Sequence, residues 1–202
     1  MKLYETKVAP NARRVRMFLA EKNIDLECIE IDLKGGGNLT EEFKAKNPFA
    51  KVPVLELDDG TIISESVAIC RYFEELHPEP SLMGETPLEK AQIEMWQRRA
   101  ELGFLFPVGM AFQHCSGYFK DRMIPNQSWG EDCIKNAFGY LKLIDQHLSE
   151  NKYLAGEKFS IADITMLTTL DFAKVVEIRL TEKHKNIQRW YDLVSQRASA
   201  SA

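Results

Sequence analysis

The sequence predicts a small α/β domain with a four-stranded mixed sheet, followed by an all-α domain. Strand-like and helix-like patterns alternate in short units over the first 76 residues, and only helical periodicity is found from position 88 onward. Three of the eight prolines lie between Pro78 and Pro87, which is typical of a linker. We therefore expect domains at 1–77 and 88–202, joined by a linker at 78–87.

The first half of the chain reads as a βαβ unit followed by a helix, a hairpin and a helix. A short strand at Leu3-Tyr4 precedes a helix that carries Val15 and Phe18. Apolar residues alternate again over 24–33, but their phase slips at Cys28-Ile29, which predicts either a bulge or a strand buried on both faces. Because a helix connects these two strands, we expect them to be parallel.

The rest of this half contains clear turn signals. A short helix begins near Thr40 and ends before Asn47-Pro48. Strands at 54–57 and 61–63 flank Asp59-Gly60, which is a hairpin signal. Ser64-Glu65-Ser66 then offers capping chemistry for a helix that begins at Val67.

The second half shows four helical patterns. A long helix is expected from Glu89 to about Phe106, with an interruption at Pro107 and a continuation to Tyr118. An amphipathic stripe covers 134–148. Ser160 and Asp163 have the spacing of a capping box and open a third helix, and the last helix carries Trp190.

Composition and charge exclude several classes of protein. The 202 residues are 45% hydrophobic and 28% charged, which is typical of a globular chain. A net charge of −4 provides no positive field for a phosphate backbone, so nucleic acid is not expected as a partner. No run approaches the roughly 20 apolar residues that span a bilayer, and Glu5 stands where a signal peptide would be apolar.

The four cysteines, Cys28, Cys70, Cys115 and Cys133, are widely separated and form no CxxC or metal-ligand spacing. This pattern predicts reduced, mostly buried thiols in a cytoplasmic protein without a metal site.

Three short segments carry candidate chemistry. Val52-Pro53 begins a strand, where the proline marks either an ordinary boundary or a cis bond that exposes the Val52 backbone to an extended peptide. Glu65-Ser66 begins a helix, where it serves as a simple cap or holds the ammonium and carboxylate of an amino acid. Asn11 lies at the junction of the first strand and first helix, as a helix cap or a ligand-facing residue.

These segments, in this order, resemble the glutathione-binding domain of cytosolic glutathione S-transferases. The likeness rests on Asn47-Pro48, Lys51-Val52-Pro53-Val54-Leu55 and Ser64-Glu65-Ser66, and on Phe159-Ser160-Ile161-Ala162-Asp163 in the second half. Ala9 to Arg16 and Glu75 to Pro80 are similar to a bacterial and fungal branch of the family. The resemblance implies a thioredoxin-like first domain, a cis Pro53, glutathione as co-substrate with no further cofactor, and a homodimer.

The resemblance also implies roles for individual residues. Val52 would pair with the cysteinyl backbone of glutathione. Glu65 and Ser66 would hold the γ-glutamyl end, while Lys51 and Asn38 would meet the glycyl carboxylate.

The sequence departs from the family pattern at the position that activates the thiol. Most members use a Tyr, Ser or Cys near the end of the first strand, but 7–12 contains none, and Ala9 stands where a Ser is expected. Thr6 and Asn11 are the nearest donors, and relatives in this branch are understood to use a His and a Ser of the helical domain, matched here by His114 and Ser116. One hydrogen bond to an anion contributes about 1.5–3 kcal/mol, which matches the roughly 2–3 kcal/mol needed to ionise a thiol of pKa about 8.5 at pH 7.

The leading hypothesis is an enzyme of detoxification that joins the glutathione thiolate to small hydrophobic electrophiles. One alternative is a glutathione-dependent peroxidase or disulfide reductase, although a mixed-disulfide mechanism needs a cysteine near 7–12. Another is a non-catalytic glutathione-binding scaffold, which would have no need of a zwitterion site.

Overall fold

The computed structural model describes residues 1–202. Two compact units are present, Met1–Ser81 together with Ala198–Ala202, and Leu82–Arg197. The chain end belongs to the first unit because Arg13 Nη2 donates a 2.7 Å hydrogen bond to the Ala200 carbonyl and Ser199 Oγ donates to Glu21. The sequence patterns contain no signal for this return of the chain end.

The first unit is the predicted four-stranded mixed sheet with three helices. Its elements are β1 (Lys2–Glu5), α1 (Pro10–Glu21), β2 (Glu27–Glu30), α2 (Glu41–Lys46), β3 (Val54–Glu56), β4 (Ile62–Ser64) and α3 (Ser66–Leu76). The strand order is β2-β1-β3-β4. β1 runs parallel to β2 and antiparallel to β3, and β3 and β4 form the predicted hairpin.

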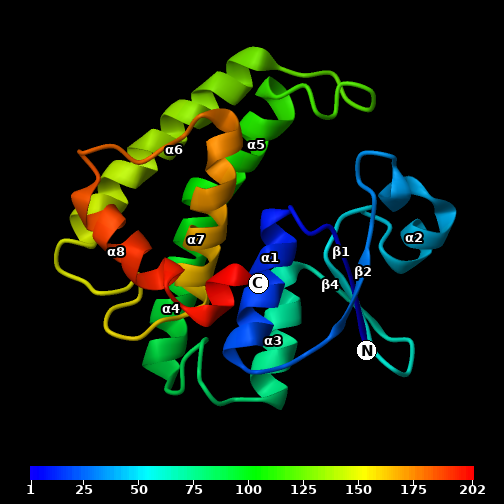
Figure 1. Cartoon of the computed structure of the whole chain (residues 1–202), viewed down its shortest axis with the longest axis horizontal. Coiled ribbons are helices and arrows are strands. Elements are labelled where there is room, and N and C mark those ends of the chain that lie inside the picture. Colours follow the sequence, from blue (N-terminus) through cyan, green and yellow to red (C-terminus); the bar gives the residue numbers. More distant parts are fainter. The chain divides into compact units, whose positions relative to one another are not determined.

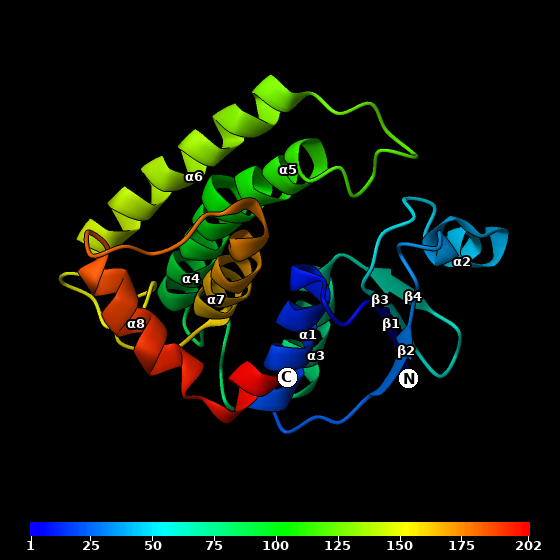
Figure 2. The same cartoon turned by 45° about the horizontal axis from the view of Figure 1, so that its top comes forward.

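Helices α1 and α3 lie side by side on one side of the sheet, and α2 lies on the other side (Figure 2). The core forms where α1 and α3 meet the strands. Leu3 of β1 lies opposite Leu55 of β3, and both are fully buried, as are Val15 and Phe18 of α1. Val15 and Phe18 therefore lie on one buried face of α1, as their helical spacing predicts.

The predicted extent of the second strand was wrong. Only Glu27–Glu30 forms β2, and it contains neither a bulge nor two buried faces. β2 is the edge strand of the sheet, so it has one neighbour and most of its residues are exposed. One further backbone bond, from Ile31 N–H to the Glu5 carbonyl, continues the pairing.

The second unit is all-helical, as predicted. Its helices are α4 (Pro87–Ala100), α5 (Phe106–Cys115), α6 (Gln127–His147), α7 (Ile161–Ala173) and α8 (Lys185–Ser195). α5 lies along α6, and α4 lies along α7 (Figure 1). α7 is the central helix, buried continuously from Ile161 to Leu170.

A helix start and a helix interruption that the sequence indicates both appear in this unit. Ser160 and Asp163 form the predicted capping box, and Asp163 also accepts a 2.9 Å hydrogen bond from Trp190 Nε1. Pro107 lies in the first turn of α5, but Leu105 before it is already helical, so the proline removes one N–H donor from a continuous helix. The interruption takes the form of a π-helical segment, Glu101–Leu105, directly before α5. No helix of the structure has the length and apolar character to cross a membrane.

Candidate functional site

A cavity of about 40 Å³ lies within the first unit, among the segments that the sequence singles out. It is lined by Asn11, Asn47, Lys51, Val52, Pro53, Glu65 and Ser66. Six of these residues were candidates from the sequence, and they come from three separate elements. The fold therefore brings the first turn of α1, the loop before β3 and the start of α3 to one place.

The loop before β3 is held by two asparagine side chains. Asn47 Nδ2 donates to the Lys51 carbonyl at 2.8 Å, and Asn47 Oδ1 accepts from Phe49 N–H at 3.2 Å. Asn38 Nδ2 donates to the Ala50 carbonyl at 2.7 Å. These bonds fix the backbone on the N-terminal side of Val52, so Asn38 supports the cavity without lining it.

The backbone N–H and carbonyl of Val52 are unpaired. Neither its N–H nor its carbonyl makes a hydrogen bond to the protein, and the ladder between β1 and β3 starts only at Val54. The Val52–Pro53 bond is cis, as predicted. An unpaired N–H and carbonyl at the start of a strand can pair with an extended peptide.

The start of α3 differs from a simple capped helix. The residue before the helix is Glu65, with φ of 70°, and no side chain caps the helix. The capping role considered for Ser64-Glu65-Ser66 is therefore not observed. The first N–H groups of α3 remain free of intrahelical partners and provide a positive helix end for an anion.

Ser66 is buried and accepts a 2.9 Å hydrogen bond from Arg14 Nη1. The hydroxyl keeps its own proton, which it can donate to a carboxylate. Glu65 is exposed and carries a negative charge at the edge of the same cavity. A hydroxyl that can donate to a carboxylate and a negative charge that can attract an ammonium thus line the same cavity.

The two candidate donors of the first unit are in different situations. Thr6 is buried, and its hydroxyl donates to the Ile31 carbonyl at 2.5 Å, which uses its only proton. Asn11 is the second residue of α1, after Ala9 at the cap position, so it does not cap the helix. The Asn11 amide lines the cavity and makes no hydrogen bond to the protein, so it is free to donate.

His114 and Ser116 belong to the second unit, at the end of α5. His114 Nδ1 accepts a 3.0 Å hydrogen bond from Asn126 N–H, which in the neutral ring leaves the proton on Nε2. Ser116 is exposed, and its Oγ accepts from Tyr118 N–H at 3.1 Å.

None of the four cysteines forms a disulfide; Cys70 and Cys133 are buried, while Cys28 is exposed. Burial raises the pKa of Cys28, Cys115 and Cys133, so these thiols are poor nucleophiles at neutral pH. No group of three or more His, Cys, Asp or Glu side chains has a metal-binding arrangement.

Two residues of the site were not found from the sequence. Arg14 was not a site candidate from the sequence, yet it is buried and donates a hydrogen bond to Ser66. Asn47 was treated as a helix boundary before Pro48, yet its amide shapes the loop that presents Val52. A polar side chain next to Pro48 and a run of arginines gave no signal that separates these roles from surface roles.

The fold and the cavity together define a two-unit protein whose first unit has a thioredoxin-like arrangement and a cavity where an unpaired backbone segment, a helix N-terminus and a carboxylate meet. Comparison with known families agrees with this description. Residues 3–81 match the glutathione S-transferase N-terminal domain, and residues 125–198 match the glutathione S-transferase C-terminal domain. The chain therefore belongs to the glutathione S-transferase family and is a glutathione transferase, as predicted.

Individual relatives support the same assignment. The chain is 40% identical to glutathione S-transferase 2 of Saccharomyces cerevisiae, over 98% of this chain and 87% of the relative. It is similar to the crystal structure of Gtt2 from S. cerevisiae, with a TM-score of 0.95 at 40% identity, covering 100% of this chain and 99% of the other. A Gtt2-class glutathione S-transferase of Vibrio parahaemolyticus has a TM-score of 0.87 at 41% identity, covering 98% and 94%. These relatives are fungal and bacterial, as the sequence motifs predict.

Proposed function

We propose that this glutathione transferase joins the thiolate of glutathione to small hydrophobic electrophiles, with glutathione as co-substrate and no resident cofactor. The observation that carries the proposal is the single cavity lined by Asn11, Val52, Glu65 and Ser66. In the reaction, the thiolate attacks an electrophilic carbon and a C–S bond forms. The electron pair of the broken bond leaves with a halide or moves onto a neighbouring carbon of an alkene.

Binding follows from the groups that line the cavity. The free N–H and carbonyl of Val52 pair with the cysteinyl residue of glutathione as one rung of an antiparallel ladder. The γ-glutamyl carboxylate accepts from Ser66 Oγ and from the first N–H groups of α3, and Glu65 attracts the ammonium. Lys51, whose side chain is exposed, attracts the glycyl carboxylate.

The chemistry requires a group that stabilises the thiolate. Asn11 is suited to this role because its amide lines the cavity and has no other partner. A hydrogen bond to an anion contributes about 1.5–3 kcal/mol, which is enough to lower a thiol pKa of about 8.5 by one to two units. His114 and Ser116 remain proposed contributors that act through water.

An apolar electrophile is favoured by the side chains of the second unit. Phe112 lies 5.3 Å from Tyr118, 5.8 Å from Phe119 and 5.1 Å from Phe172, measured between ring centroids. Aromatic rings pack with planar apolar groups in offset or edge-to-face arrangements, which supports a hydrophobic electrophile.

One set of assays separates this function from its alternatives. Purified protein is supplied with glutathione and 1-chloro-2,4-dinitrobenzene, and conjugate formation is followed by absorbance. Parallel samples receive cumene hydroperoxide or a small disulfide, and calorimetry measures glutathione binding. Conjugation above the uncatalysed rate supports the proposal. Turnover of the hydroperoxide or disulfide alone would indicate the peroxidase or reductase, and binding without any turnover would indicate a scaffold.

We also propose a homodimeric, cytoplasmic enzyme with a role in detoxification. Support for the dimer comes from exposed apolar side chains at helical spacing along α4, the π-helical segment and α5: Leu88, Met95, Leu102 and Phe106. Light scattering should then give a mass about twice the 23.2 kDa of the chain, and Leu102→Glu should shift the mass toward that of one chain.

A further inference from the structure

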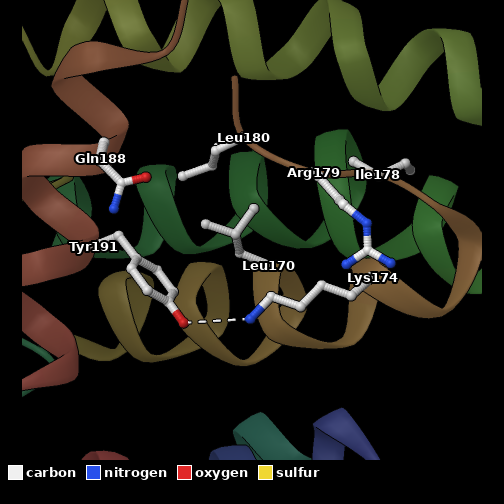
Figure 3. A pocket seen from close by; sticks show the side chains of 7 residues that line it. All are labelled: Leu170, Lys174, Ile178, Arg179, Leu180, Gln188 and Tyr191. Atoms are coloured by element: carbon white, nitrogen blue, oxygen red, sulfur yellow. Dashed lines mark hydrogen bonds between the residues drawn. The ribbon is translucent and has the colours of Figure 1, made fainter. Parts of the chain in front are cut away.

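A second cavity, of about 220 Å³, lies within the helical unit between the end of α7, the segment that follows α7, and α8 (Figure 3). None of its lining residues belongs to the glutathione cavity. A ligand that enters this cavity whole must be compact, because the volume is below the range of drug-sized pockets.

The inner wall of this cavity is apolar. Leu170 of α7 and Ile178 are buried, and Leu180 lies near Leu170 in Figure 3. The chain reverses after α7 because Glu177 has φ of 60° and Ile178 N–H donates back to the Ala173 carbonyl at 3.1 Å. This turn places Ile178 and Leu180 in the wall of the cavity. The apolar part of a ligand can pack against this wall.

The charged groups that line the cavity are both cations, Lys174 and Arg179. Their acidic partners, Asp171 and Glu177, are outside the lining. Lys174 Nζ donates to Asp171 at 2.8 Å and to the Tyr191 hydroxyl at 3.4 Å (Figure 3), which leaves one of its three N–H groups.

Arg179 also keeps a donor. Its Nε and Nη2 both donate to one oxygen of Glu177, at 3.3 and 3.1 Å, and Nη1 is unused. The hydrogen bond to Asp171 raises the pKa of Lys174, so its ammonium stays charged at neutral pH. Lys174 and Arg179 therefore each have an N–H group without an acceptor, in a cavity whose inner wall is apolar and buried.

We propose that this cavity binds a small organic acid with a compact apolar or aromatic body and one carboxylate. The apolar body covers Leu170, Ile178 and Leu180, and the carboxylate accepts from the free N–H groups of Lys174 and Arg179. The proposal does not depend on the transferase reaction, since the glutathione cavity shares no residue with this one.

Calorimetry with 2-naphthoate tests the proposal on the full chain with glutathione at saturation. We expect binding of naphthoate and at least tenfold weaker binding of the neutral analogue 2-naphthylmethanol, a difference of about 1.4 kcal/mol. Lys174→Gln and Arg179→Gln should each weaken naphthoate by a similar factor. Glutathione conjugation should be unchanged in both variants.

Lys135→Gln is the matched control, because Lys135 forms a 2.8 Å pair with Asp132 at the same three-residue spacing as Lys174 with Asp171. Naphthoate affinity should be unaffected by this change. Equal binding by wild type, Lys174→Gln and Arg179→Gln would overturn the proposal. Equal binding of the neutral analogue, loss of binding on adding glutathione, or no binding tighter than about 1 mM (about −4.1 kcal/mol) would also overturn it.

Discussion

Arg14 Nη1 donates a 2.9 Å hydrogen bond to Ser66 Oγ, and both side chains are buried although 52 positions separate them in the sequence. The bond joins α1 to the first residue of α3 and fixes the direction of the Ser66 hydroxyl. It also places a cation beside the positive end of α3, so two independent features favour an anion there. Arg14 is therefore a positioning residue for the carboxylate site, and Ser66 is the residue in contact.

Removing this contact should weaken glutathione binding. For Arg14→Met we expect an affinity loss of about tenfold, about 1.4 kcal/mol, because Ser66 loses its orientation and the site loses a cation. Calorimetry at low and high salt measures this, and the salt dependence of binding should be smaller in the variant. Arg71→Met is the control, since Arg71 lies on the same α3 and forms only a loose surface pair with Glu75. Unchanged affinity in Arg14→Met would contradict the positioning role.

The two contact residues at the start of α3 should have larger and similar effects. Glu65→Ala and Ser66→Ala are each expected to weaken glutathione by tenfold or more, about 1.4 kcal/mol or greater. Glu65→Ala should act on the ammonium, so it should affect binding of glutathione far more than binding of an analogue without the α-amino group. If both variants bind glutathione as wild type does, the assignment of the γ-glutamyl end is wrong.

Asn11 and Thr6 form a matched pair for testing thiol activation. Asn11→Ala should raise the pKa of the bound thiol by one unit or more and lower turnover about 3- to 30-fold, about 0.7–2 kcal/mol. Thr6→Val should leave that pKa unchanged, because the Thr6 hydroxyl already donates to the Ile31 carbonyl. Its effect should instead be a loss of stability of about 1 kcal/mol. Ultraviolet absorbance of the thiolate follows both variants, and the reverse pattern would make Thr6 the donor.

Asp163 should give the stability of the protein a distinctive pH dependence. Its carboxylate accepts from Leu154 N–H, Ser160 N–H and Trp190 Nε1, but complete burial dominates and raises the pKa from 3.8 to about 6. The folded protein then holds a proton that the unfolded chain releases near pH 4. The free energy of unfolding therefore contains a contribution from Asp163 that falls by about 3 kcal/mol as the pH rises from about 4 to 6.

Asp163→Asn cannot ionise, so comparing denaturant unfolding of the two proteins between pH 4 and 7 isolates this contribution. The stability of wild type relative to the variant should be greatest at pH 4 and decrease toward pH 7. A relative stability that grows with pH would mean that the hydrogen bonds outweigh burial and hold the carboxylate ionised.

Most elements of the fold could be predicted from the sequence because each one is determined by residues that are adjacent in the chain. The Asp59-Gly60 turn and the Ser160–Asp163 box each depend on a few adjacent residues, and each forms as predicted. The extent of β2 could not be predicted, because an edge strand and a central strand differ in their neighbours and not in their own sequence. Likewise, no sequence pattern shows that Ala198–Ala202 returns to α1.

The residues of the site also fall into two groups, those that local sequence patterns indicated and those that only the folded structure shows. Val52, Glu65 and Ser66 were candidates because of a proline at a strand start, an acid beside a serine at a helix start, and the family resemblance of both segments, and all three line the cavity. Arg14 and Asn47 act through contacts that only the folded chain creates, with Ser66 and with the loop before β3. Thr6 was a candidate for its hydroxyl alone, and only the fold shows that Ile31 occupies its proton.

The central claim is that this cavity holds glutathione along the Val52 backbone with its sulfur at Asn11. A crystal structure of the complex with glutathione measures this most directly. We expect two backbone hydrogen bonds of about 2.7–3.2 Å between Val52 and the cysteinyl residue. We also expect the γ-glutamyl carboxylate on Ser66 and the sulfur within hydrogen-bonding reach of Asn11 Nδ2. Glutathione bound away from Val52, or a sulfur directed away from Asn11 toward another donor, would contradict it.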